Sequence, residues 1–329
     1  MSSDAMPHLD AISTPLPWQR DAWERLAAMR ESGRLPHALL VSGEVGSGRR
    51  RFVTALSRYL LCREPVHGTN CGECKTCALS QTQGHSDWRW VGPTGKSRSI
   101  GVDQIRDVIR FTAQTSALGQ YKVLVIHPAD GMTLAAANAF LKCLEEPAAD
   151  TLILLITRSP SGVPATIRSR CQHLQLPAPD REAAAAWLAL VNGDEALARR
   201  ALLAADGMPL LAHDLLRADG ALDQAEEQQR RLTDLFEGRG SPGDAAAVLS
   251  AMETEAAATA LLKQLNRYLR ALPARQLREP KARALLAMDS RLRDLQRAVA
   301  GGATPQRDLL GATLVAQLER ILGEGRAGC

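Results

Sequence analysis

The chain has 329 residues, of which 45% are hydrophobic and 23% charged, and its formal net charge is +4. This length allows two or three domains with buried cores, and the composition is that of an ordinary globular chain. No apolar run approaches the roughly 18 residues of a membrane span, and so mild a charge is compatible with a nucleic-acid partner without requiring one.

The first ten residues, MSSDAMPHLD, contain no basic stretch followed by an apolar one. This argues against a secretory signal and predicts a cytoplasmic protein. Arginine makes up 34 of the 40 Lys and Arg residues, so an Arg in a usual Lys position can reflect composition alone. Four of the seven cysteines fall between residues 62 and 77, which in a cytosolic chain indicates metal before disulfides.

Predicted strands and helices alternate in the first half of the chain. Short, continuous apolar runs predict buried parallel strands at 37–43, 121–127, 151–157 and, more briefly, 173–176. Apolar residues at helical spacing predict helices around 105–112 and 134–144, and Pro147 closes the second. This alternation predicts an α/β fold with an open, mostly parallel sheet.

Strand signals stop after about residue 178. Two short helices follow, ending near Gly193 and Gly207. From about residue 220 the chain is rich in Ala, Leu and Arg, with helical periodicity at 222–236, 244–271, 281–299 and 306–322. We therefore predict an α/β domain at 1–178, a small helical unit at 179–219 and an all-helical domain at 220–329.

Cys62, Cys71, Cys74 and Cys77 have the spacing C-x8-C-x2-C-x2-C. Four thiolates this close in sequence can complete a tetrahedral shell around zinc and leave no open position for chemistry. A structural zinc module is therefore predicted at 62–77, with a chance cluster of reduced thiols as the alternative. Cys143 and Cys329 lie outside this pattern; Cys143 is interpreted as a small apolar residue on a helix.

The stretch LLVSGEVGSGRRRF has the outline of a phosphate-binding loop between a strand and a helix, with Gly43, Gly46 and Gly48 in place. Such a loop normally continues with Lys, which reaches the β- and γ-phosphates, and with Ser or Thr, which binds Mg²⁺. Here Arg49 and Arg50 take those positions. Arg49 can supply charge, although its planar fork does not replace a compact ammonium, and Arg50 cannot ligate a cation.

A second departure lies in the stretch VLVIHPADGM. His127 and Pro128 stand where an ATPase of this layout has its metal-holding acid and its catalytic Glu, and Asp130 lies too far along to replace them. Phosphoryl transfer depends on positioning and charge neutralisation, so these losses predict that hydrolysis is abolished. No nucleotide is expected in this degenerate site, with weak binding through the glycines as the alternative.

Five pieces follow one another in a recognisable order: LPHALLVSGEVGSGRRRF, the cysteine cluster, GVDQIRDVIRF, NAFLKCLEEP and PATIRSRCQHLQL. Together they resemble bacterial clamp-loader proteins of the DNA polymerase III delta-prime family. The resemblance is dense over residues 15–178, thins through the small helical unit, and is faint at 303–310.

This resemblance implies an AAA+ ATPase-like module with a zinc-binding insertion, then a helical lid and a helical collar that joins five subunits into a ring. The implied partners are motor subunits of the gamma or tau type and a delta subunit, and indirectly the sliding clamp, primed DNA and the polymerase core. The implied role is clamp loading during DNA replication, without ATPase activity of its own, inside a DNA-directed DNA polymerase (nucleotidyltransferase) complex.

Ser169, Arg170 and Cys171 match the family's arginine-finger motif, SRC. The resemblance implies that Arg170 reaches across a subunit boundary to ATP on a neighbouring motor subunit, where it would stabilise transition-state charge. Taken alone, Arg170 would be one more surface arginine. ATP-hydrolysing relatives also place an Arg in the lid after a Gly-Ser pair, whereas GMPLLAHDLL has Leu210 there.

Two further segments have alternative interpretations. Asn138, Lys142, Glu145 and Glu146 either form the solvated face of their helix or lie near subunit contacts, where Lys142 would meet a DNA phosphate. The basic stretch 93–100 lacks the spacing of a second phosphate loop and is predicted to be an exposed loop.

Two other functions compete with clamp loading. The first is an active AAA+ ATPase that uses Arg49 in its phosphate loop. The second is a zinc-ribbon nucleic-acid binder, which is disfavoured because only Trp88 and Trp90 lie near the cysteine cluster to stack on bases.

Overall fold

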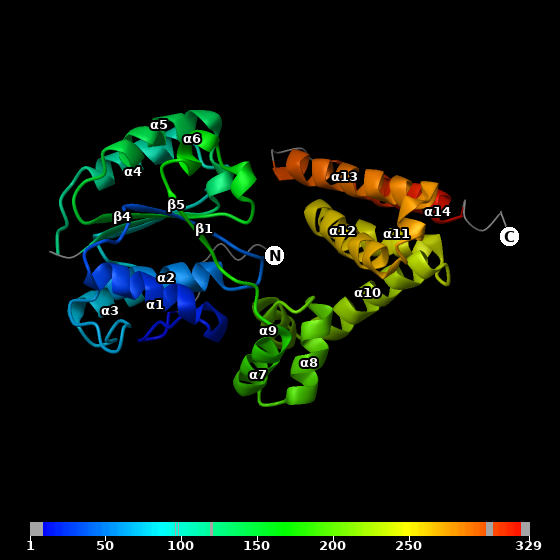
Figure 1. Cartoon of the computed structure of the whole chain (residues 1–329), viewed down its shortest axis with the longest axis horizontal. Helices are drawn as coiled ribbons and strands as arrows, with labels where there is room; N and C mark the ends of the chain where they lie inside the picture. Colours follow the sequence, from blue (N-terminus) through cyan, green and yellow to red (C-terminus); the bar gives the residue numbers. More distant parts are fainter. Residues whose placement is uncertain (1–8, 96, 98, 119–120, 301–304, 324–329) are drawn as a thin grey trace. The chain divides into compact units, whose positions relative to one another are not determined.

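The computed structural model describes residues 9–95, 97, 99–118, 121–300 and 305–323 (Figure 1). The chain divides into two compact units, Met1–Asp214 and Leu215–Cys329. The proposed domain boundaries at 178 and 220 stay predictions. Some residues named in the sequence analysis lie outside the described residues: 1–8 of the N-terminal stretch, Cys329, and positions 96, 98, 303 and 304.

The first unit contains a five-stranded sheet in which every pairing is parallel. Its strands are β1 (Ala38–Ser42), β2 (Trp88–Val91), β3 (Lys122–Ile126), β4 (Thr151–Ile156) and β5 (Gln172–Gln175). Their order across the sheet is β2-β3-β4-β1-β5. The predicted parallel sheet is confirmed, with β2 as an additional edge strand that the apolar pattern did not predict.

Helices cover both faces of this sheet (Figure 1). They are α1 (Arg20–Glu31), α2 (Arg49–Leu61), α3 (Lys75–Gln81), α4 (Val102–Thr112), α5 (Leu134–Glu145) and α6 (Ala165–Arg168). Successive strand residues point to opposite faces, so Leu39 and Val41 of β1 enter one core with α1 and α2. Leu40 enters the other core, with α4 and α5. Burial on both faces explains why β1, β3 and β4 are apolar except for one terminal residue each: Ser42, Lys122 and Thr151.

Three helices follow the sheet: α7 (Arg181–Asn192), α8 (Glu195–Ala204) and α9 (Pro209–Arg217), and the boundary of the first unit at Asp214 falls within α9. The Asp180 carboxylate caps α7 by accepting from the N–H of Ala183 at 2.7 Å, and Asp194 caps α8 in the same way. Gly193, with φ of +77°, ends α7 in the left-handed conformation common at helix ends. The two predicted helices are present, and α9 is an additional one.

The second unit is helical in its described part, with a core of its own that is rich in leucine. Its helices are α10 (Ala221–Glu237), α11 (Pro242–Ala251), α12 (Thr254–Ala271), α13 (Pro280–Ala300) and α14 (Arg307–Gly323). The prediction of one helical segment over 244–271 is wrong: Met252 and Glu253 have extended backbones that separate α11 from α12. No Gly or Pro marks this break, so the pattern gave no signal for it.

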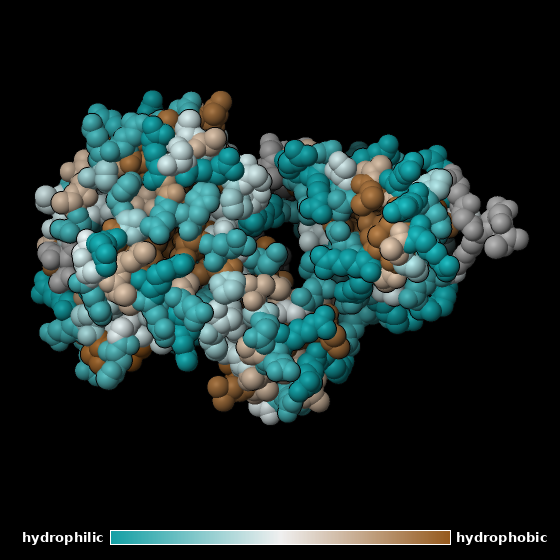
Figure 2. All heavy atoms as spheres, viewed as in Figure 1, coloured by the Kyte–Doolittle hydropathy of each residue, from teal (hydrophilic) through white to brown (hydrophobic). Residues whose placement is uncertain are grey.

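Among the described residues, none of the helices is long and apolar enough to cross a membrane. Hydrophilic side chains predominate on the face of the molecule drawn in Figure 2, with apolar residues in smaller groups between them. The described residues of 93–100 contain no helix or strand, and the Ser97 hydroxyl donates to the carbonyl of Ser99 at 2.9 Å.

Candidate functional sites: cysteine cluster, glycine loop and Arg170

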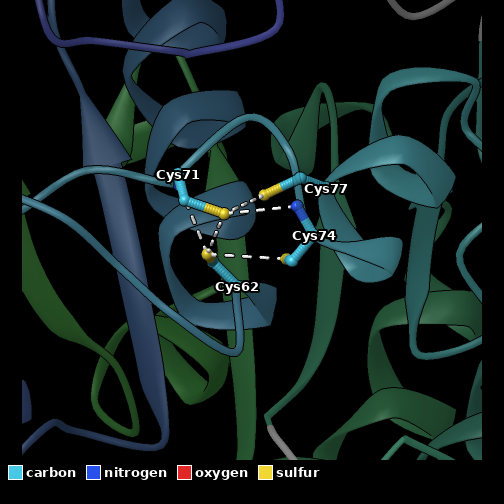
Figure 3. Close-up of side chains that lie close together, drawn as sticks. All are labelled: Cys62, Cys71, Cys74 and Cys77. Carbon is cyan, nitrogen blue, oxygen red and sulfur yellow. Dashed lines mark hydrogen bonds between the residues drawn. The ribbon is translucent and has the colours of Figure 1, made fainter.

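The four predicted metal ligands converge in space (Figure 3). Cys62 caps the C-terminus of α2, Cys74 caps the N-terminus of α3, Cys77 lies in the first turn of α3, and Cys71 lies on the loop between the two helices. Their sulfur atoms all lie within 4.8 Å of one another. The structure thus confirms that these residues form a cluster able to hold a metal ion.

The sulfur separations fit a tetrahedral zinc site. Cys62 Sγ lies 3.6 Å from Cys71 Sγ and 3.9 Å from Cys74 Sγ, and Cys71 Sγ lies 3.8 Å from Cys77 Sγ. Four sulfurs placed tetrahedrally at the usual Zn–S distance would be about 3.8 Å apart. A disulfide would need sulfurs about 2 Å apart, so this arrangement matches a shared cation better than a cross-link.

The surroundings also suit bound thiolates. The N–H of Cys71 donates to Cys62 Sγ at 3.3 Å, and that of Cys74 donates to Cys71 Sγ at 3.4 Å. Burial by contrast raises the pKa of the Cys62 thiol to about 12, so that this sulfur would be held as a thiolate only by a bound cation. The buried guanidinium of Arg58 interacts electrostatically with Cys62 and Cys77, and its positive charge would offset part of the negative charge of a zinc tetrathiolate.

The glycine loop lies at the carboxyl edge of the sheet, after β1. Gly46 and Gly48 have φ of +86° and +96°, where residues with a Cβ are strained, and Arg49 begins α2. In the strand order, β4 lies between β1 and β3, so the residues that follow these strands gather at the same edge. Ligands of open α/β sheets bind at this edge.

Arg49 and Asp130 come together there. Burial lowers the pKa of Arg49; the charges of Asp130 and Glu44 oppose that shift, and Arg158 adds to it. The Asp130 carboxylate accepts from the hydroxyl of Thr157, the residue after β4, at 2.8 Å. Asp130 was expected to lie too far along the chain to replace the missing acids. In the structure its charge interacts with that of Arg49, and its oxygen accepts a hydrogen bond from Thr157.

The start of α9 packs against the loop from the other side. The N–H of Leu210 donates to the carbonyl of Gly46 at 3.2 Å. A Cβ on Gly46 would lie 2.6 Å from Leu211 Cγ and 2.9 Å from Met208 Cβ. Leu210, in the position where a hydrolysing relative is expected to have an arginine, therefore offers the loop a backbone donor and no charge.

The second arginine of the loop faces an aromatic ring. The Arg50 guanidinium lies 5.8 Å from the centre of the Trp90 ring, within reach of a cation–π interaction. The Trp90 ring in turn lies 6.2 Å from that of His127. Arg50, which stands where a phosphate loop has its Mg²⁺-binding hydroxyl, thus points toward Trp90 of β2.

Arg170 lies between α6 and β5, and its side chain is 36% exposed. Its Nε and one terminal nitrogen both donate to Glu145 Oε1, at 3.0 and 2.6 Å. Its other terminal nitrogen donates to the carbonyl of Thr166 at 3.0 Å. Ser169 caps α6, whereas Cys171 is buried, and burial raises the pKa of its thiol to about 11. Only the arginine of this motif presents a charged group toward solvent.

The helix NAFLKCLEEP divides into two faces. Phe140 and Cys143 are buried, and Cys143 Sγ lies 3.4 Å from the Thr112 hydroxyl, in line with its interpretation as a core residue. Lys142 and Glu145 are exposed. For Lys142 both interpretations stay open: an exposed residue on the solvated face, or a contact with DNA or another subunit. Glu145 forms an ion pair with Arg170.

Sequence reasoning missed two residues that organise the cysteine cluster, Arg58 and Asn70. Both are fully buried and hydrogen-bonded to the segment before α1. A charged residue in the buried stretch FVTALSRYLL of α2, four positions before Cys62, was the available signal for Arg58. Asn70 precedes Cys71 directly, and its surroundings could not be read from the pattern.

The sequence of the chain is similar to those of known proteins. A family model described as "DNA polymerase III, delta subunit" matches residues 18–180. DNA polymerase III subunit delta' of Pseudomonas aeruginosa is 39% identical over 209 residues, which is 63% of each chain. The Escherichia coli subunit is 40% identical over 189 residues, covering 57% of this chain and 56% of the relative. That of Haemophilus influenzae is 35% identical over 230 residues, covering 69% and 68%.

The first unit combines a five-stranded parallel sheet, a glycine loop after β1 and a cluster of four cysteines. The chain belongs to the DNA polymerase III delta-prime family. The match spans 63% and 56% of the length of the first two relatives, so what the whole proteins do is carried over only as a proposal. A DNA polymerase III gamma-subunit-related structure from Thermotoga maritima is similar over 91% of this chain and 99% of its own, with 20% identity and a TM-score of 0.43.

Proposed function

We propose that the chain is a non-hydrolysing subunit of the DNA polymerase III clamp loader. It assembles with gamma- or tau-type motor subunits and a delta subunit in the cytoplasm, and the complex places the sliding clamp on primed DNA for the polymerase core. The chain supplies Arg170 in trans to ATP held by a neighbouring motor subunit.

The observation that supports this best is the side chains at the carboxyl edge of the sheet: Arg49 and Arg50 follow the glycine loop where Lys and Ser or Thr are expected, and Arg50 lies against the Trp90 ring. A site that hydrolyses ATP needs, at this edge, a cationic side chain that binds phosphate and acidic side chains that bind Mg²⁺. Here the Asp130 carboxylate accepts from the Thr157 hydroxyl, Arg50 stands at the position of the metal-binding hydroxyl, and the lid presents Leu210. Three elements from separate parts of the chain have thus lost the groups that hydrolysis needs.

Arg170 differs from these lost groups because it keeps its charge at the surface. Its only carboxylate partner among the described contacts is Glu145 of the same chain, and that pair is about half exposed. Exposed ion pairs are worth about 0–1 kcal/mol. A nucleotide phosphate on a neighbouring subunit can therefore compete with Glu145 for the guanidinium at little cost.

The cysteine cluster is proposed to hold one structural Zn²⁺ through Cys62, Cys71, Cys74 and Cys77. All four sulfurs are used as ligands, so no position is left for a catalytic water. The metal would supply cross-linking energy to a loop whose fold depends on it.

The isolated chain, assayed for Mg²⁺-dependent ATP turnover, tests the non-hydrolysing role. The expected result is no turnover above that of a blank, with motor subunits assayed in parallel as the positive control. Robust hydrolysis by the isolated chain would favour the alternative, an active AAA+ ATPase that uses Arg49 in its phosphate loop.

A further inference from the structure

The segment Leu9–Gln19 runs from the cysteine cluster to the glycine loop and contacts both; we call it the strap. The proposed function gives the strap no role, and it lies outside the predicted motifs. At the cluster end, Leu9 is buried in the core beside α1 and α2. At the other end, Leu16 and Gln19 are 1% and 0% exposed. Residues between these anchors, such as Ile12 and Thr14, are exposed, so the strap is a surface segment held at both ends. A segment held in this way can transmit the state of one site to the other.

Asn70 joins the strap directly to a metal ligand. Its side-chain N–H₂ donates to the carbonyl of Ala11 at 2.8 Å and to Cys77 Sγ at 3.5 Å. Its side-chain oxygen accepts from the N–H of Ser13 at 2.8 Å. Asn70 is fully buried, so each of these bonds would be expensive to leave unmade. The position of Asn70, and with it the strap, depends on where the Cys77 sulfur lies.

Arg58 fastens the same part of the strap. Its guanidinium donates to the carbonyl of Ala11 at 2.9 Å and to the hydroxyl of Ser13 at 2.6 Å, and it also donates to the carbonyl of Asp10. Arg58 lies in the last turn of α2, four residues before the ligand Cys62, so these bonds join the strap to the helix that ends at that ligand.

At its far end the strap contacts the glycine loop. The Ser47 carbonyl accepts from Trp18 Nε1 at 2.9 Å and from Gln19 Nε2 at 3.0 Å. A Cβ on Gly48 would lie 2.3 Å from Leu16 Cδ1, so the Leu16 side chain sits directly against the loop backbone. The Gln19 side chain also accepts from the N–H of Leu16 at 3.0 Å, which fixes the strap at this point.

Between its two ends the strap has little freedom. Only Thr14 and Pro15 separate Ser13 from Leu16, and Pro17 follows. Proline fixes φ near −65°, and so short a connection gives displacement at Ser13 few residues over which to be absorbed before Leu16.

We propose that metal in the cysteine cluster holds the strap in place, and that loss of the metal releases the strap from the glycine loop. The module at 62–77 is then a conformational device that sets the order of the loop, in addition to being a local cross-link. This inference rests on the proposed metal site.

Hydrogen exchange of the full chain, with metal bound and after chelation under reducing conditions, tests the inference. Peptides covering the strap and residues 43–50 should exchange at least about tenfold faster without metal, because their buried bonds open locally. Peptides from α10 serve as the internal control and should not change. Faster exchange at 62–77 with unchanged strap and loop peptides would overturn the proposal.

Asn70→Ala separates the strap from the cluster without removing a ligand. With metal content confirmed by elemental analysis, the strap of this variant should exchange at the metal-free rate while 62–77 stays protected, and exposed Glu73→Ala is the matched control. A normally protected strap in metal-loaded Asn70→Ala would overturn the coupling, and this variant decides the matter if chelation unfolds the whole first unit. Absence of metal from the wild-type chain would instead refute the zinc assignment.

Discussion

Removing the Asp130 carboxylate should destabilise the first unit measurably. Asp130→Ala leaves the half-buried charge of Arg49 without its strongest opposing charge, although Glu44 still compensates in part. It also removes the acceptor of the Thr157 hydroxyl, which keeps the Ser159 carbonyl at 3.0 Å as an alternative. Losing the hydrogen bond from Thr157 and the charge compensation of half-buried Arg49 should each cost about 1 kcal/mol, so the expected loss is about 2 kcal/mol.

Denaturant unfolding followed by tryptophan fluorescence measures this loss. All five tryptophans lie between residues 18 and 187, so the signal reports on the first unit alone. Asp103→Ala is the matched control, because the Asp103 carboxylate is 87% exposed in its pair with Arg106 and should change stability by less than about 0.5 kcal/mol.

A double-mutant cycle identifies the cause. Arg49→Met removes the charge and keeps an unbranched side chain, so Arg49→Met with Asp130→Ala should be more stable than the sum of the single changes by about 1 kcal/mol or more. Additive effects, or an Asp130→Ala variant as stable as the control, would refute the view that the charges of Arg49 and Asp130 stabilise each other.

Three other predictions concern separate parts of the chain. Burial raises the pKa of Asp87, but hydrogen bonds from Ala117, Leu118 and Ser116 outweigh it and hold the pKa below its ordinary value. The stability that these bonds contribute is present above the ordinary pKa of about 3.9 and is lost as acid protonates the carboxylate. Asp87→Asn should therefore weaken the loss of unfolding free energy between about pH 5 and pH 2, and an unchanged pH profile would contradict this. Glu145→Ala should shift the unfolding free energy by less than about 1 kcal/mol, and a larger loss would show that its pair is structural. Elemental analysis should find about one zinc per chain and little in Cys77→Ser; equal metal in both would exclude the cluster.

The sheet was predictable because its central strands are buried on both faces. Apart from one terminal residue each, β1, β3 and β4 are continuous apolar runs, which is the direct consequence of helices on both sides. β2 escaped prediction because it reads Trp-Arg-Trp-Val at the sheet edge, where Arg89 is exposed. The break between α11 and α12 was missed because it uses ordinary residues in extended conformation and no Gly or Pro.

The candidate sites were predictable to the extent that their residues lie close in sequence. Four cysteines within one short stretch predicted their own cluster, and three glycines predicted their loop. The pairing of Arg49 with Asp130 joins the ends of β1 and β3, and the contacts of Asn70 with the strap join residues 57 and 59 positions apart. Such contacts depend on tertiary packing, which spacing in the sequence does not encode.

ATP turnover by the reconstituted complex with wild-type or Arg170→Ala chain tests the central claim most directly. Loss of an arginine finger costs about 10³–10⁵ in rate at its site, so turnover at the neighbouring motor subunit should disappear while assembly and folding are unchanged. Arg181→Ala, another exposed arginine of the first unit, should behave as wild type. Full turnover by a correctly assembled Arg170→Ala complex would contradict the account.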